Sequence, residues 1–270
     1  AIKTRNCIKR VLVPALTYIS SLHAVWNAGL QVRLVDVDPK TYNLDWRYLP
    51  PLRETDVLMP VHLFGNPTRP PPQLGYWDDK TIVEDACEAL GAEGTGYGDA
   101  VAFSFYVAHT ITTGVGGMVA TRHQWLDDAV KRLCNHGRAR ARDLYAGLRV
   151  DQVDADVRFR FTEVGFSYKL GDVNAALGVG QMKRLDTIIA SRREVATKLR
   201  EVLSPFPLQL PYDTGDHTYM MFPLVCKESG VRDELMAHLA TLNIETRHLM
   251  PVTNQPIVQK VMGDIEDKYP

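Results

Sequence analysis

The chain has 270 residues, a size that allows one or two domains with a proper hydrophobic core. Its 45% hydrophobic and 23% charged residues are typical of globular proteins, and its net charge of −1 gives no electrostatic attraction to nucleic acid or to an acidic membrane. No apolar run approaches the roughly 20 residues that span a bilayer, and the four cysteines lack metal-ligand spacing, which predicts a cytoplasmic protein with free thiols and no metal site.

Short apolar runs recur along the first half of the chain and predict the buried strands of a mostly parallel sheet. These runs are Val11–Val13, Gln31–Val35, Asp56–Pro60, Thr81–Val83, Ala100–Phe105 and Gly117–Thr121. A helix is expected at Ser20–Ala28, with Ser20 as its cap and its end near Gly29. The pattern at Trp125–Cys134 predicts a second helix.

The second half of the chain predicts a smaller unit that follows a long helix. The amphipathic stretch Arg184–Leu203 is expected to link two domains, which we place at residues 1–190 and 191–270. In the second unit we expect a strand at His217–Val225, a helix at Val231–Leu242 and a strand at Asn243–Arg247. The pattern therefore predicts an α/β fold with a small α+β C-terminal domain.

Polar side chains gather after two neighbouring predicted strands. Glu84, Asp85 and Glu88 follow the first, whereas Ser104 and His109 end the second. Chemistry in open α/β sheets collects at the carboxyl ends of strands, so we expect these groups to lie near one another.

These stretches resemble those of a known family. VEDACEALGA at 83–92, GDAVAFSFY at 98–106 and the GVGG loop at 114–117 are similar to segments of the DegT-type sugar aminotransferases. VHLFGNP, NHGR and VGFSYKLGDVNAALGVGQMKRLD match further segments in order. The resemblance implies a fold-type I enzyme with a mostly parallel seven-stranded sheet between helices. It also implies pyridoxal 5′-phosphate or pyridoxamine 5′-phosphate as cofactor, and a nucleotide-linked keto sugar as substrate.

The resemblance assigns cofactor roles to six residues. Asp85 would hold the pyridine nitrogen protonated, although a helix-capping aspartate is the alternative. Tyr18 would stack on the ring rather than serve only as a core tyrosine. Glu88 would position either the ring hydroxyl or His109, or else be surface charge. Ser104 would donate to the phosphate, and Ser167 and Lys169 would serve a phosphate site shared across a homodimer.

Four further residues are implied as substrate-binding groups. Arg158 and Arg160 lie in the charged stretch Ala139–Phe161. In relatives this stretch reaches the active site of the neighbouring subunit, and the alternative interpretation is a solvated surface. Arg247 and His248 open the closing motif, where an arginine suits both a carboxylate and a phosphate. An amino donor such as glutamate is the second expected partner.

One departure from the family decides the predicted chemistry. The aminotransferases carry a lysine in SFYxxK that forms an imine with the cofactor, but position 109 here is histidine. An imidazole forms no stable imine, yet it exchanges protons near neutrality. The segment at Ser104–Thr112 resembles a branch of sugar 3-dehydratases, so we expect removal of the 3-hydroxyl of a 4-keto-6-deoxy sugar with His109 as acid and base.

Two alternatives remain open from the sequence. One is an aminotransferase that holds its cofactor without an imine or through another lysine, with Lys169 the first candidate. The other is a non-catalytic relative that keeps the fold as a binding or assembly module, which is favoured by the lack of a glycine- and Ser/Thr-rich phosphate turn in residues 1–10. We expect such segments to be missing from this sequence, and an intact mass well above 30.3 kDa would show it.

Overall fold

The computed structural model describes residues 8–70, 80–139, 159–213, 215–228, 230–249, 251–265 and 268–269. A six-stranded sheet forms its centre, in the order β2-β1-β3-β4-β5-β6. Its strands are β1 (Arg10–Pro14), β2 (Gln31–Val35), β3 (Asp56–Leu58), β4 (Thr81–Asp85), β5 (Ala100–Ser104) and β6 (Gly117–Thr121). The first five run parallel and β6 is antiparallel to β5. The predicted α/β fold is confirmed, but the described residues form six of the seven strands that the family resemblance implies.

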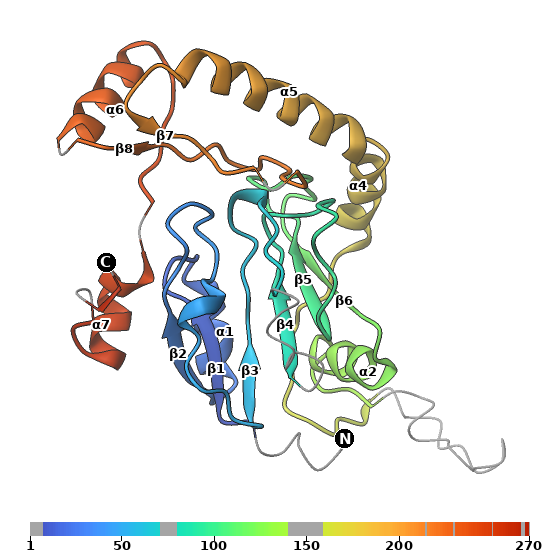
Figure 1. The fold of residues 1–270 in the computed structure, drawn as a ribbon. Coiled ribbons are helices and arrows are strands. Elements are labelled where there is room, and N and C mark those ends of the chain that lie inside the picture. The colour runs from blue at the N-terminus through green and yellow to red at the C-terminus, as the bar shows by residue number, and fades with distance from the viewer. Residues whose placement is uncertain are drawn as a thin grey trace, which may run out of the picture.

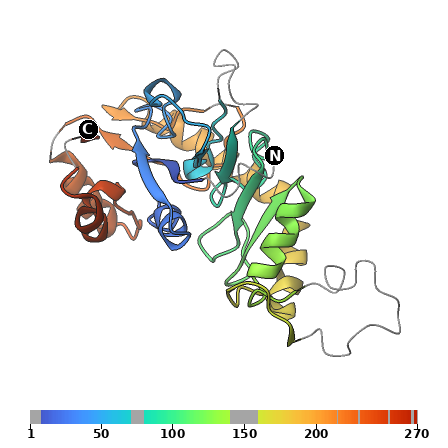
Figure 2. The same ribbon diagram turned by 90° about the horizontal axis from the view of Figure 1, so that it is seen from below.

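Helices surround the sheet and extend over one of its edges. They are α1 (Ser20–Asn27), α2 (Gln124–Leu133), α4 (Asp172–Met182), α5 (Leu185–Leu203), α6 (Val231–Thr241) and α7 (Pro256–Met262). Figure 1 shows α5 crossing above the carboxyl ends of the strands, with α6 and the small sheet of β7 (Leu208–Gln209) and β8 (Val225–Cys226) beyond it. Seen from below, α2 lies beside β6, at the opposite end of the sheet from α7 (Figure 2).

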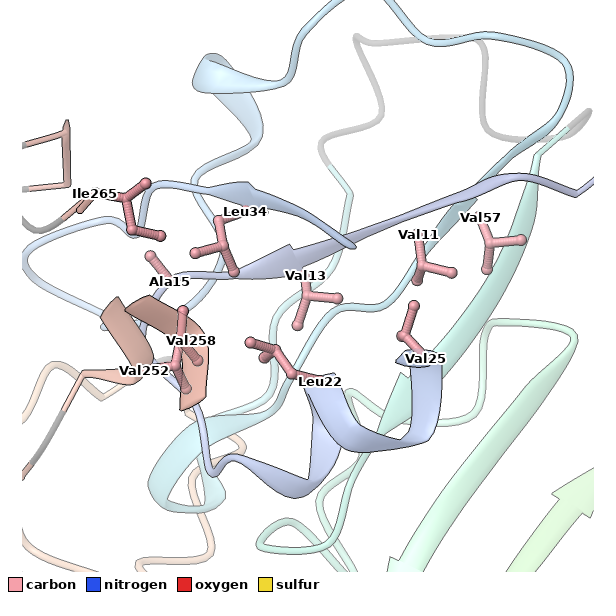
Figure 3. Packing of buried hydrophobic residues seen from close by; sticks show 10 residues of the cluster. All are labelled: Val11, Val13, Ala15, Leu22, Val25, Leu34, Val57, Val252, Val258 and Ile265. Atoms are coloured by element: carbon pink, nitrogen blue, oxygen red, sulfur yellow. The ribbon is translucent and has the colours of Figure 1, made fainter. Parts of the chain in front are cut away.

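The main hydrophobic core joins the two ends of the chain. Branched aliphatic residues of β1, β2 and β3 pack against α1 and against the C-terminal residues around α7 (Figure 3). The buried members are Val11, Val13, Ala15, Leu22, Val25, Leu34, Val57, Val252, Val258 and Ile265. The amide of Val252 also donates to the carbonyl of Ala15 at 3.2 Å. Residues 252–265 therefore pack on the large domain, and the division at residue 190 stays a prediction.

Three local predictions differ from the structure. We expected Ser20 to cap α1 with its side chain. In the structure the cap position is Ile19, Ser20 is the first residue of the helix, and no side chain caps it. Residues 217–224 form no strand: the amides of Thr218 and Met221 bond to the turn after β3, and the carbonyls of residues 217, 219 and 220 accept from arginines of α5. Asn243–Arg247 is also not a strand. The amides of Asn243 and Ile244 bond back to α6, and Asn243 has a positive φ of 57° that ends the helix.

A buried hydrogen-bond network around Glu84 joins two loops on one side of the sheet. His62 Nε2 lies 2.9 Å from Glu84 Oε2, and neither side chain is exposed. Because His62 Nδ1 accepts from the amide of Thr68 at 3.0 Å, the ring proton lies on Nε2 and donates to Glu84. The amides of Gly96 and Gly98 also donate to the carboxylate of Glu84, at 2.9 and 2.6 Å. This network links the loop after β3 to the loop before β5.

Two simpler features complete the fold. Cys87, Cys134 and Cys226 are free thiols and only partly buried, and Cys7 lies outside the described residues. Among the helices that the structure describes, none has both the length and the apolar character needed to cross a membrane.

Candidate active site

Asp85 ends β4 at the carboxyl edge of the sheet, and two hydrogen bonds reach its carboxylate. Ser21 Oγ donates to Asp85 Oδ2 at 2.7 Å, and Thr17 Oγ1 lies 3.0 Å from Ser21 Oγ. The amide of Cys87 donates to Asp85 Oδ1 at 3.2 Å. Residues 86–91 form turns and not a helix, so Asp85 does not cap a helix. Its carboxylate is instead oriented by the first turn of α1.

Glu88 lies in the turns that follow Asp85 and is mostly enclosed. The amide of Phe64 donates to Glu88 Oε2 at 2.5 Å. Burial raises the pKa of Glu88 to about 7, the bond from Phe64 works against the rise, and the charge of Asp85 adds to it. A carboxyl group that exchanges its proton near neutrality is suited to acid–base chemistry.

Ser104 and His109 belong to the end of β5 and the tight turn that follows it. His109 Nδ1 lies 3.3 Å from Ser104 Oγ, and the amide of His109 donates to the carbonyl of Tyr106 at 3.0 Å. Burial lowers the pKa of His109, whereas the bond to Tyr106 and the charge of Asp85 raise it. The imidazole is therefore largely neutral at neutral pH and able to accept a proton.

The structure brings Asp85, Glu88 and His109 into one electrostatic group. The charge of Asp85 raises the pKa of both Glu88 and His109. They come from the ends of the adjacent strands β4 and β5, as expected for an open parallel sheet. Their chemical roles stay predictions.

Tyr18 lies in the loop between β1 and α1, at the same edge of the sheet. Its side chain is 73% exposed, and its carbonyl accepts from the amide of Ser21. The ring is thus not a core tyrosine, which was the alternative to stacking. Its backbone is bonded to Ser21, whose hydroxyl donates to Asp85.

Ser167 and Lys169 are exposed residues of the segment that precedes α4. Ser167 pairs with Asn135 in an isolated bridge after α2. The neighbouring Leu170 lies against the loop after His109, because a Cβ on Gly116 would meet Leu170 Cδ1 at 2.6 Å. This segment therefore approaches the loop that carries His109, and it has no described bond to Asp85.

The weaker substrate-binding predictions fall on the surface. Arg160, Arg247 and His248 are exposed, and Arg247 lies 3.5 Å from Glu245. Arg158 lies outside the described residues. For Arg160, Arg247 and His248, the described part of the chain shows no contact with Asp85, Glu88 or His109.

Thr17 and Ser21 are two site residues that the sequence did not indicate. Both are buried, and together they orient the carboxylate of Asp85. The serine pair Ser20 and Ser21 was visible in the sequence, but it indicated a helix cap. Only the packing of α1 against the carboxyl end of β4 shows that Ser21 serves the site.

The fold belongs to the pyridoxal-phosphate fold-type I class, as similar solved structures show. A structure of the Escherichia coli GDP-4-keto-6-deoxy-D-mannose-3-dehydratase, with bound hydrated PLP, matches 94% of this chain and 70% of its own with a TM-score of 0.84 and 25% identity. A mutant of the dehydratase ColD with bound GDP-perosamine matches with a TM-score of 0.82, again over 94% and 70% of the two chains, at 25% identity.

The chain belongs to the DegT/DnrJ/EryC1/StrS aminotransferase family, whose model matches residues 6–270. It is 33% identical to a GDP-perosamine synthase of Caulobacter vibrioides, over 89% of this chain and 67% of the relative. It is 30% identical to a GDP-4-keto-6-deoxy-D-mannose 3-dehydratase of Yersinia pseudotuberculosis, over 89% and 65%. The chain thus spans about two thirds of the length of these relatives. The family prediction from the sequence is confirmed.

Proposed function

We propose that this chain forms the active part of a 3-dehydratase that uses pyridoxamine or pyridoxal phosphate on a GDP-linked 4-keto-6-deoxy sugar. The observation that carries the proposal is His109 at the end of the β5 turn, in bonding distance of Ser104 and within the field of Asp85. The GDP-sugar names of both kinds of relative support the substrate class.

The described residues fit the cofactor. A ring nitrogen that is to stay protonated needs a carboxylate partner, and Asp85 offers one that Ser21 and the amide of Cys87 already orient. Tyr18 offers an exposed ring at the same edge. In this proposal Ser104 donates to the phosphate, and Ser167 and Lys169 serve the phosphate site of a partner subunit. When bound, the cofactor supplies an electron sink for cleavage of a neighbouring carbon–hydrogen bond.

His109 is the proton-transfer group of the proposed reaction. Its Nδ1 faces Ser104, so Nε2 exchanges the proton. Since burial lowers the pKa of His109, the neutral imidazole would accept at Nε2 the proton of the carbon–hydrogen bond that is cleaved, and would then deliver this proton to the departing hydroxyl, which leaves as water. In this proposal Glu88 orients the cofactor or His109. An amino donor such as glutamate restores the amine form of the cofactor.

An exposed apolar surface supports the proposed homodimer. In α4 no residue is buried, although the helix is rich in apolar residues. Apolar side chains around it are also exposed, which is typical of protein–protein interfaces. The exposed residues are Val164, Phe166, Tyr168, Leu170, Val173, Leu177, Val179 and Met182. Light scattering tests the dimer, and a monomer at micromolar concentration would contradict it.

A transamination function is the second candidate, because GDP-perosamine synthase relatives reach 33% identity. In that case a lysine elsewhere in the chain holds the cofactor, because residue 109 is histidine. Lys169 is the first candidate, since its neighbour Leu170 contacts the loop after His109. Such an enzyme yields an amino sugar instead of a deoxy sugar.

Borohydride reduction in the presence of pyridoxal phosphate, followed by intact mass, separates the candidates. The dehydratase proposal predicts cofactor binding without an adduct in the wild type, and an adduct at residue 109 in His109→Lys. An adduct that disappears in Lys169→Ala would instead establish the aminotransferase. Incubation with GDP-4-keto-6-deoxymannose and glutamate then shows a deoxy or an amino sugar by mass. Absence of cofactor binding would refute both and leave the non-catalytic alternative.

A further inference from the structure

Residues 217–221 connect α5 to the turn after β3, and we name them the bridging segment. Its carbonyl groups face α5, where Arg193 Nε donates to the carbonyl of His217 at 2.9 Å. Arg192 Nη1 donates to the carbonyls of Tyr219 and Met220 at 3.1 and 3.0 Å. The long helix therefore fixes the position of the bridging segment through charged donors.

The amides of the bridging segment face the opposite way. Both the amide and the hydroxyl of Thr218 donate to the carbonyl of Gly65, at 2.8 and 3.3 Å. The amide of Met221 donates to the carbonyl of Phe64 at 3.3 Å. Thr218 is fully buried, so no water competes for these bonds. The Phe64–Gly65 turn is thereby bonded to a segment about 150 residues away in the sequence.

The turn itself has a conformation that needs this support. Phe64 has a φ of 64° and Gly65 a φ of 90°, and a bulky residue rarely adopts a positive φ. A Cβ on Gly65 would meet Thr218 Oγ1 at 2.3 Å and the carbonyl oxygen of Glu88 at 3.1 Å. The turn is thus enclosed between Thr218 on one side and Glu88 on the other.

The same turn presents an amide to the candidate active site. This amide is that of Phe64, which donates to Glu88 Oε2 at 2.5 Å. The Phe64 amide that donates to Glu88 and the Gly65 carbonyl that accepts from Thr218 therefore belong to the same turn. We propose that Thr218 is a positioning residue, which holds the Phe64–Gly65 turn and through it the carboxyl group of Glu88 beside Asp85.

The charge of Glu88 offers a measurement of this link. Burial raises its pKa to about 7, the bond from Phe64 lowers it, and Asp85 raises it. The other ionisable group whose charge interaction with Glu88 is described is the thiol of Cys87. Loosening the turn weakens the bond that lowers the pKa, so the pKa of Glu88 moves upward. A general loss of stability produces no such directed shift.

The test compares Thr218→Val with Thr218→Ser and with Thr253→Val, a control at another buried threonine. In Thr218→Val, hydrogen exchange in residues 62–66 becomes about fivefold faster, the size expected for one hydrogen bond. The carbon-13 NMR titration of Glu88 shifts to higher pH. Thr218→Ser restores both readouts, and Thr253→Val changes neither. Unchanged exchange and titration in a folded Thr218→Val protein would overturn the proposal.

Two further measurements complete the test. If Thr218→Val does not fold, Glu88→Ala probes the link from the other side, and exchange of the Thr218 amide must rise together with that of Phe64. The catalytic consequence rests on the proposed function: kcat falls with an unchanged KM for the GDP-sugar. Exchange and titration need no turnover. A protein that shows both shifts but no sugar chemistry supports the positioning role and refutes only the proposed function.

Discussion

Replacing Glu88 with glutamine changes how the stability of this protein depends on pH. In the folded protein, burial raises the pKa of Glu88 from 4.5 to about 7. The folded state therefore binds more protons than the unfolded state between these two values, and stability falls as pH rises through that window. Glutamine keeps an acceptor for the amide of Phe64 but does not ionise.

The size of the effect follows from the two pKa values. Between pH 5 and pH 8, ionisation of Glu88 removes about 2.5 kcal/mol from the free energy of unfolding of the wild type. The Gln variant does not lose this contribution, so its stability relative to the wild type rises by about the same amount over this range. Other groups titrate alike in both proteins and cancel in the difference.

Urea unfolding of both proteins at pH 5, 6, 7 and 8, without cofactor, measures this difference. Glu54→Gln, at an exposed position, controls for the loss of one negative charge. A stability difference between wild type and Glu88→Gln that stays constant from pH 5 to pH 8 would refute the argument that Glu88 is charged only at a desolvation cost.

Three further predictions concern single side chains. His109→Asn binds pyridoxal phosphate like the wild type but loses about 10²–10⁴ in elimination rate, measured by single-turnover product formation, and a full rate would contradict its role as acid and base. Ser21→Ala leaves Asp85 without its 2.7 Å donor, so we expect about 1–2 kcal/mol lower stability by urea unfolding and weaker cofactor binding by fluorescence titration. Asp56→Asn leaves the guanidinium of Arg10 without its partner carboxylate and costs about 3 kcal/mol at pH 7 in the same unfolding assay. Burial acts to raise the pKa of Asp56 but the bonds from Arg10 lower it overall, so this cost is present above about pH 4 and shrinks as pH falls through the folded pKa.

The sheet was predictable because each of its strands contains a short run rich in Val, Ile, Leu or Ala. Gln31–Val35 and Gly117–Thr121 have the predicted bounds, and β3, β4 and β5 differ by two residues or fewer at either end. The grouping of Asp85 with Glu88 and His109 was predictable for a related reason. Parallel strands present their carboxyl ends at one edge, so polar residues after neighbouring strands must lie near one another.

Contacts between distant segments were not predictable. Ser21 and Asp85 are 64 residues apart, and nothing local in the sequence indicates that one orients the other. The stretch from His217 has the composition of a strand, yet its amides and carbonyls bond to the turn after β3 and to the arginines of α5. Strand propensity reports how a segment suits a pleated surface, and it does not say which partners the backbone finds.

Two consecutive acids on β4 serve opposite sides of the sheet. Glu84 is fully buried with His62, and Asp85 meets Ser21 at the candidate site, since successive side chains of a strand alternate in direction. A slip of one residue in the pairing of β4 would exchange them, and would turn the structural acid toward the cofactor position. Any transfer of strand-end loops between relatives must therefore conserve the register of β4, because the register decides which of the two acids faces the site.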